Sequence, residues 1–507
     1  MNATLDAVLA ARVYQSGRAV RRTSLRHTHL SDKALGIVVW RLGGERFRAA
    51  AVAWGPVGGR YQLAVAGEPR NRDLYFAALT PFATDLCAHI RRAAAVTEER
   101  RRGTWVDHIP VDPTQVVVAN RATADALGLL GRYLGYLSDR NGQTPDPNLV
   151  EAGKHLRFYA KHSWVPGQAL IVALDRLVAD HWATLASPLE QANLAALDAQ
   201  IEPAAGLSAY QASAQAERDL PVGPEPPETI DRKTMDLLDT FNGRRKGSVD
   251  PKLIKSLIGP LNEHYRSHVD PVWELIGRVH AREAALEPAP STVRRFADDR
   301  VAFGRHVNWV VGQGGRYRTT DTPRQAATTL RTLEEAQRRL HAEMALDDPA
   351  CMVPYLLAGK ALSGTVVSTD IGHKERPNIR EVSRPRITVD TDDPVVLPDG
   401  KALWWADNDD KAWNVISTAA YGTSTRVVLQ LDAPYDRDRV PGRGGRVVYS
   451  ELHAEPGGWS RPLPQNPPWC HRPDTPPAPP AAIDGGDGET PPAPVDGATL
   501  PNREAYR

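Results

Sequence analysis

Two carboxylates and a lysine in the C-terminal third are the residues whose types most suggest catalysis. Asp399 follows a proline, and Asp409-x-Lys411 comes shortly downstream. Two carboxylates can hold a divalent metal ion while a lysine beside them orients the attacking water. The stretch between them, KALWWAD, alternates as a β-strand does, and the Asp and Asn residues at its ends favour turns. We therefore interpret these acids as turn residues at the two ends of one strand.

The order of these residues resembles the PD-(D/E)xK motif of nucleases, which would imply metal-dependent cleavage of nucleic acid. In that family the second acid and the lysine lie inside a strand, next to the first acid. Here both groups fall in predicted turns, and a short motif outside its structural context gives weak support for a function. We predict no nuclease site at these positions.

The remaining chemical motifs each have a simpler structural interpretation. His264 and His268 lie four residues apart in a predicted helix, a spacing that can place two imidazoles on one metal ion, but the sequence offers no third ligand. GQGG at 312–315 follows a predicted helix, which indicates a helix C-terminus and not a phosphate-binding loop. Neither a P-loop nor a G-x-S-x-G elbow occurs. We predict no catalytic residue, no metal site and no cofactor.

Charge is more informative than motifs in residues 231–345, which contain 20 Lys/Arg against 15 Asp/Glu. An Arg-aromatic-Arg element beside a glycine loop, as at 316–318, can contact phosphates while its ring stacks on a base. A solvated helical surface is the alternative, because a basic stripe is necessary for nucleic-acid binding but not sufficient. The candidate contact residues of this block are Arg244, Arg245, Lys246, Arg294, Arg295, Arg316, Tyr317 and Arg318.

Residues 361–455 carry 12 Lys/Arg and 15 Asp/Glu, so this region is not basic as a whole. Its arginines are concentrated in ERPNIREVSRPR and RDRVPGRGGR, which we expect in loops or at strand edges. In KALWWAD, Leu403 and Trp405 share one face of the predicted strand and Trp404 faces outward. A rim of this kind could contact nucleic acid or dock a charged protein. The candidate residues are Arg380, Arg384, Arg386, Trp404, Arg443 and Arg446.

The helices and strands that the sequence predicts around these residues indicate an α+β protein. We expect a small antiparallel α+β unit at 1–103 with a meander and a long helix over 73–102, a helical block at 104–201, and a linker at 202–230. A mildly basic helical bundle follows at 231–346, with a break at Asp270-Pro271, and then a small β-barrel of OB or SH3-like size at 347–455. Residues 456–507 hold 14 of the 42 prolines, and we expect them to be disordered.

Bulk composition limits the class of protein. The formal net charge is +1, so nucleic-acid or membrane binding would need a local patch. The three cysteines, Cys87, Cys351 and Cys470, are far apart, which favours a reducing compartment over a disulfide framework. The chain has neither an N-terminal signal segment nor a long apolar run, and we predict a soluble cytoplasmic protein without membrane contact.

We predict a non-catalytic, intracellular accessory protein that associates with nucleic acid or with a nucleic-acid-processing complex, for example beside a helicase or nuclease subunit. Two alternatives stay open. One is a protein-interaction scaffold without nucleic-acid contact, using the proline-rich tail as tether or ligand. The other is an enzyme whose site is assembled from distant residues.

Overall fold

Three short apolar runs separated by turns form an antiparallel meander near the N-terminus, as predicted. The strands are β2 (Leu35–Arg41), β3 (Ala49–Pro56) and β4 (Gln62–Val65). The computed structural model describes residues 3–45, 47–102, 105–138, 144–187, 189–318, 320–376 and 381–454. The predicted disordered tail lies outside the described residues.

Two further strands extend the meander into a mixed sheet. β7 (Val116–Val118) pairs parallel with β2, and β8 (Ile171–Ala173) pairs parallel with β7, so the strand order is β4-β3-β2-β7-β8. The sequence predicts β7 but places residues 171–173 in a helix, and this prediction is wrong. Three residues, two of them buried, are too short a run for a period to show, and only the pairing with β7 defines the strand.

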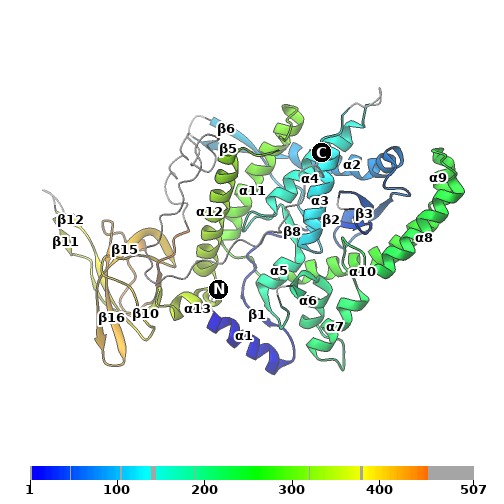
Figure 1. Ribbon diagram of the computed structural model, residues 1–507. Helices are drawn as coiled ribbons and strands as arrows, with labels where there is room; N and C mark the ends of the chain where they lie inside the picture. The colour runs from blue at the N-terminus through cyan, green and yellow to red at the C-terminus, as the bar shows by residue number, and fades with distance from the viewer. Residues whose placement is uncertain are drawn as a thin grey trace, which may run out of the picture.

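Helices cover both faces of this sheet (Figure 1). Because successive strand residues point to opposite faces, Ile37 and Val39 of β2 enter one core while Val38 and Trp40 enter another. The first core is closed by α2 (Arg72–Ala95), α3 (Arg121–Gly135) and α4 (Pro147–His162). The second is closed by α5 (Leu174–His181), α6 (Leu194–Ile201), α8 (Glu228–Arg245) and α10 (Gly259–Ala284).

Two predicted helix boundaries differ from the structure. The helix predicted over 73–102 ends at Ala95, because TEERRR pairs as β5 (Thr97–Arg102) with β6 (Trp105–Pro110). The break predicted at Asp270-Pro271 is absent, and α10 continues through Pro271. Val269 and Val272 on either side of the proline are fully buried, so packing against the sheet offsets the lost backbone hydrogen bond.

The remaining helices surround this layered unit and lead to the barrel. The N-terminal helix is joined to the body by a two-residue strand pair, β1 (Val20–Arg21) with β9 (Trp182–Ala183). The other helices are α1 (Ala3–Ser16), α7 (Ala209–Asp219), α9 (Pro251–Leu257), α11 (Ser291–Val307) with a π-turn over Asn308–Gly312, α12 (Pro323–Asp347) and α13 (Pro349–Leu357). The π-turn ends at GQGG, in agreement with the predicted helix C-terminus.

Six strands close the predicted barrel, which Figure 1 shows beside α12 and α13. Leu403, Trp413 and Val415 are buried in its interior. The order is β10 (Ala361–Asp370), β13 (Arg386–Thr391), β16 (Ser424–Leu431), β15 (Asn408–Tyr421), β14 (Ala402–Trp405) and β17 (Arg446–Ser450). A small hairpin, β11 (Lys374–Glu375) with β12 (Val382–Ser383), projects from it.

The carboxyl ends of the parallel strands are crossed by a segment of the predicted linker. Ligands of open α/β sheets commonly bind at this edge. Here the Arg41 N–H donates to Pro224 O at 2.8 Å, and Asn120 Nδ2 donates to Gly223 O at 2.8 Å. Asp175 lies at the same edge, where burial raises its pKa to about 6. The protein's own backbone therefore occupies the usual ligand position.

None of the helices in the described ranges has the length and apolar character needed to cross a membrane.

Candidate nucleic-acid interface

Lysine and arginine side chains gather with aromatic rings where α3, α4 and the start of α2 meet the loop after α11. We call this set the basic cleft surface. Its cations are Arg48, Arg72, Arg132, Lys154, Arg157, Arg316 and Arg318, and its aromatic residues are Phe47, Tyr133, Tyr136 and Tyr317.

A close crossing of α3 and α4 brings the two helices' parts of this surface together. A Cβ atom added at Gly153 would lie 2.3 Å from the Gly135 nitrogen, so only glycine allows the backbones to approach this closely. Asn120 caps the start of α3, as predicted, by accepting the Thr123 N–H at 2.8 Å. The crossing places Tyr136, at the C-terminal end of α3, against Arg157 of α4.

Arg157 is held between two aromatic rings. Its guanidinium carbon lies 4.9 Å from the ring centroid of Tyr136 and 4.2 Å from that of Tyr317. The Tyr136 hydroxyl donates to the Arg318 carbonyl at 2.6 Å, which fixes the 316–318 loop on the helix pair. Stacking between rings lowers the entropy that this arginine would lose on contacting a phosphate.

An open cleft of about 520 Å³ lies beside this stack. Phe47, Arg72, Arg132, Tyr133 and Tyr136 are among the residues that line it. Phe47 is 49% exposed, and Tyr136 is 38% exposed although Arg157 lies over its ring, so part of each residue is within reach of a ligand. The cleft is open to solvent and is not an enclosed pocket.

The cations of this surface have no carboxylate partner among the described residues. Nearby acids pair elsewhere: Glu151 binds Arg91, and Glu45 binds Arg70. Partial burial is the main cause of the lowered pKa of Lys154; the neighbouring Arg316 lowers it further, and Glu151 opposes both effects. The surface is therefore a local positive field on a protein that is nearly neutral overall.

The predicted contact residues of the helical block are dispersed in the structure. Arg316, Tyr317 and Arg318 belong to the basic cleft surface. Arg244 and Lys246 are exposed at the end of α8.

Three other predicted residues in this block have partners within the fold. Arg245 is buried and pairs with Glu68, and Arg295 is buried and pairs with Glu343. Arg295 also donates to the His27 carbonyl, so it joins α11 and α12 to the N-terminal segment. Arg294 is exposed, 3.8 Å from Glu343.

The predicted barrel residues are likewise divided. Arg384 pairs with Asp432, and Arg386 pairs with Glu375. Arg443 and Arg446 are exposed and form no ion pair in the described part of the chain. Arg380 lies outside the described residues.

Trp404 is half-buried and stacks on His453, with ring centroids 4.6 Å apart, so it is less open than predicted. Trp405 packs partly buried against the barrel core, on the inner side. The register shifts between these two tryptophans, which is why simple alternation describes them only in part.

The remaining members of the basic cleft surface were missed by sequence reasoning. Arg48, Arg132 and Arg157 come from three segments far apart in the chain, and only the fold joins them. The alternation of basic and aromatic residues in RYLGY, at 132–136, is a signal that could have indicated one part of it.

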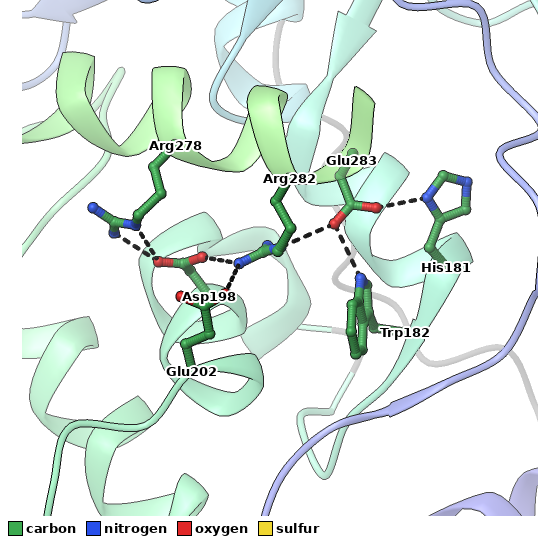
Figure 2. Close-up of polar contacts among 7 residues, drawn as sticks. All are labelled: His181, Trp182, Asp198, Glu202, Arg278, Arg282 and Glu283. Carbon is green, nitrogen blue, oxygen red and sulfur yellow. Dashed lines mark hydrogen bonds and ion pairs between the residues drawn. The ribbon is translucent and has the colours of Figure 1, made fainter. Parts of the chain in front are cut away.

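A second group of arginines contacts two buried acids in a polar network (Figure 2). Arg278 and Arg282 of α10 bind Asp198 of α6, at 2.7 and 2.5 Å. Arg282 also contacts Glu283, whose other partners are His181 Nδ1 at 2.8 Å and Trp182 Nε1 at 3.0 Å.

This network is structural. Burial opposes ionisation of Glu283, but the bonds from His181 and Trp182 and the charge of Arg282 hold its pKa below the usual value. Both acids have arginine partners within the protein, and these residues do not line the cleft of the basic surface. The network joins α5 and α6 to α10.

The motifs considered for catalysis do not assemble. Asp399 lies in the turn before β14, as predicted. Asp409 and Lys411 lie on β15, so the turn predicted for them is wrong, and Lys411 is 3.4 Å from Asp410. None of the described clusters with metal-ligating groups contains these residues. His264 is buried, with Nε2 2.9 Å from the Thr234 hydroxyl, as a structural histidine would be. Comparison with known proteins found no match: no family model, no curated protein and no solved structure is similar to the chain.

Proposed function

We propose that this protein binds single-stranded nucleic acid at the basic cleft surface, as an accessory factor. The observation that carries the proposal is the group of cations without carboxylate partners, interleaved with exposed rings around an open cleft. Arginine and lysine neutralise phosphates, and rings stack on bases of any sequence. Bases in a single strand can reach Phe47 and Tyr136, whereas bases in a duplex are already stacked on one another.

The test is fluorescence anisotropy of a labelled 20-nucleotide single strand, as DNA and as RNA, titrated with the full chain over a range of salt concentrations. We expect binding at low salt. A plot of log K against log salt concentration should have a slope of about −0.7 for each phosphate neutralised. A duplex of the same sequence should bind more weakly, because its bases are not free to enter the cleft. Failure to bind a single strand at low salt would overturn the proposal.

Charge-reversed variants locate the site. The triple variant Arg132→Glu, Arg316→Glu, Arg318→Glu removes exposed cations that form no ion pair, and it should abolish binding. The matched control, Arg244→Glu, Arg443→Glu, Arg446→Glu, reverses the same number of exposed arginines elsewhere and should bind as the unmodified protein does. The opposite result would assign binding to the barrel rim and the end of α8.

A ring variant separates stacking from charge. Phe47→Ala leaves every cation in place, so it should weaken single-strand binding by about 5- to 100-fold, the usual cost of one base stack. Binding of heparin, which has sulfates but no bases, should stay unchanged. Equal losses for both ligands would show that the cleft attracts polyanions without receiving bases.

A further inference from the structure

A cysteine, a glutamate and a histidine meet under the surface where α2 packs on α4. Cys87 comes from α2, and Glu151 and His155 come one turn apart from α4. Their ligand atoms all lie within 4.8 Å of one another. Cys87 and His155 are fully buried, while the Glu151 side chain is 15% exposed and marks the side that faces solvent.

The orientation of His155 is the most telling feature of this cluster. Its Nδ1 lies 3.0 Å from Nε2 of the buried His306, which fixes the ring. Its Nε2 makes no regular hydrogen bond and faces Glu151 Oε1 at 3.5 Å, a contact that is an ion pair only when the ring is protonated. A buried ring nitrogen this weakly satisfied is costly, and an imidazole held by a second group through its other nitrogen is the usual arrangement of a metal ligand.

We propose that Cys87, Glu151 and His155 bind one Zn²⁺ ion, which joins α2 to α4. Thiolate, imidazole and carboxylate are the three ligand types that zinc takes in proteins. The Cys87 thiol would release its proton to solvent as the sulfur–zinc bond forms. Water from the Glu151 side would complete the tetrahedron. This site was not predicted from the sequence, and it does not depend on nucleic-acid binding.

Arg91 is the natural competitor of the ion. Its Nε lies 2.9 Å from Glu151 Oε1, and its second contact is to Oε2. The Arg91 side chain is 47% exposed, so it can withdraw from Oε1 into solvent when the metal arrives. Metal affinity should therefore rise when this guanidinium is removed.

A second cluster, His27 with Asp348 and Cys351, serves as an internal comparison. The Asp348 carboxylate caps α13 and accepts N–H bonds from Ser24, Leu25 and Ala350, so its oxygens are already engaged. The unpaired nitrogen of His27 is Nδ1, whereas Nε2 is the atom near Asp348 and Cys351. This cluster has the composition of a metal site without an unpaired atom directed into it.

The test is metal uptake by the full chain. After incubation with Zn²⁺ and dialysis, elemental analysis should find one zinc per chain. Co²⁺ should give the visible bands of a tetrahedral ion together with a sulfur-to-cobalt charge-transfer band. Cys87→Ser should remove the charge-transfer band, and the matched Cys351→Ser should leave it intact. Absence of stoichiometric zinc, or loss of the band in Cys351→Ser but not in Cys87→Ser, would overturn the proposal.

Two further variants test the arrangement around the ligands. His306→Phe keeps a ring stacked on Phe158 but removes the partner of His155 Nδ1, and it should weaken zinc binding by about 10- to 100-fold. Arg91→Gln should strengthen it. If Cys87→Ser fails to fold, the Arg91→Gln result still decides, because a purely structural Arg91–Glu151 pair would leave zinc uptake unchanged.

Discussion

The polar network of α10 and the basic cleft surface use the same residue type in opposite ways. In the network, Arg278 and Arg282 meet Asp198 and Glu283, and each charge is matched within the fold. On the basic cleft surface, Arg132 and Arg316 have no carboxylate partner in the described ranges. Arginines that pair with carboxylates of the same protein hold its helices together. A group of arginines without carboxylate partners produces a positive potential that an anionic ligand can neutralise.

The largest expected effect comes from breaking the network. Glu283→Ala removes the acceptor of His181, Trp182 and Arg282 together. Arg282 keeps Asp198, but His181 Nδ1 and Trp182 Nε1 lose their partner. We expect a loss of about 3–5 kcal/mol in the free energy of unfolding, measured by urea denaturation followed through tryptophan fluorescence. Glu202→Ala is the control, because Glu202 is 62% exposed and 3.9 Å from Arg282, and its loss should cost at most about 1 kcal/mol. Similar losses in both variants would show that the network is not a structural unit.

A side chain added where α3 and α4 cross should push the two helices apart and so disturb the basic cleft surface that they carry. Gly153→Ala puts a methyl group into the Gly135 backbone and should cost about 1–3 kcal/mol of stability while weakening oligonucleotide binding. The control is Gly243→Ala in α8, where a Cβ meets nothing within 4 Å. That variant should gain about 0.5–1 kcal/mol from helix propensity, so equal behaviour of the two would contradict a close crossing.

Acid should weaken the fold at a buried histidine without involving either group of arginines. Burial, with the charges of His268 and Lys233, lowers the pKa of His264 to about 4. In the unfolded chain the pKa of this histidine is near 6.5, so between pH 4 and pH 6.5 the unfolded state binds more protons than the folded state. The stability that the neutral His264 contributes is therefore complete above about pH 6.5 and is lost as the pH falls toward 4. His264→Gln should be destabilised most at pH 7, and its deficit should shrink by about 1–3 kcal/mol by pH 4.5. A deficit independent of pH would show that His264 does not carry the effect.

The smallest effect on stability is expected for Arg132, an arginine of the basic cleft surface without a carboxylate partner in the described residues. Arg132→Gln should change the free energy of unfolding by less than about 0.5 kcal/mol, since its side chain is exposed and forms no ion pair. In the oligonucleotide titration, however, the salt dependence of log K should become shallower by about 0.7. A marked loss of stability would place Arg132 with the architectural arginines.

The meander and barrel strands could be predicted because their signals are local. Alternation and glycine turns recur within ten or so residues in both regions. β8 and the continuity of α10 through Pro271 could not, because each depends on a partner from elsewhere in the chain: β7 for the strand, and the sheet for the helix. Local propensity is overridden where burial is complete.

Site residues were harder to predict for the same reason. The sequence gives no reason to distinguish Arg295 from Arg316. Only the fold shows that Arg295 forms an ion pair with Glu343, whereas Arg316 is exposed and forms none in the described part of the chain. Cys87 and His155 carry no spacing motif, since they come from different helices and meet through packing. Sequence reasoning therefore named residues 316–318 but neither their neighbours on the basic cleft surface nor the residues of the proposed zinc site.

The position of α10 in the chain has a consequence during synthesis. The five strands of the sheet are complete by Ala173, but α10, which covers one of its faces, begins only at Gly259. At the usual rate of about 5–20 residues per second, the ribosome needs several seconds to produce the intervening segment. During this interval the face is covered only in part, by α5 and α6 and then by α8, so the nascent chain should be a client of ribosome-associated chaperones until α10 emerges.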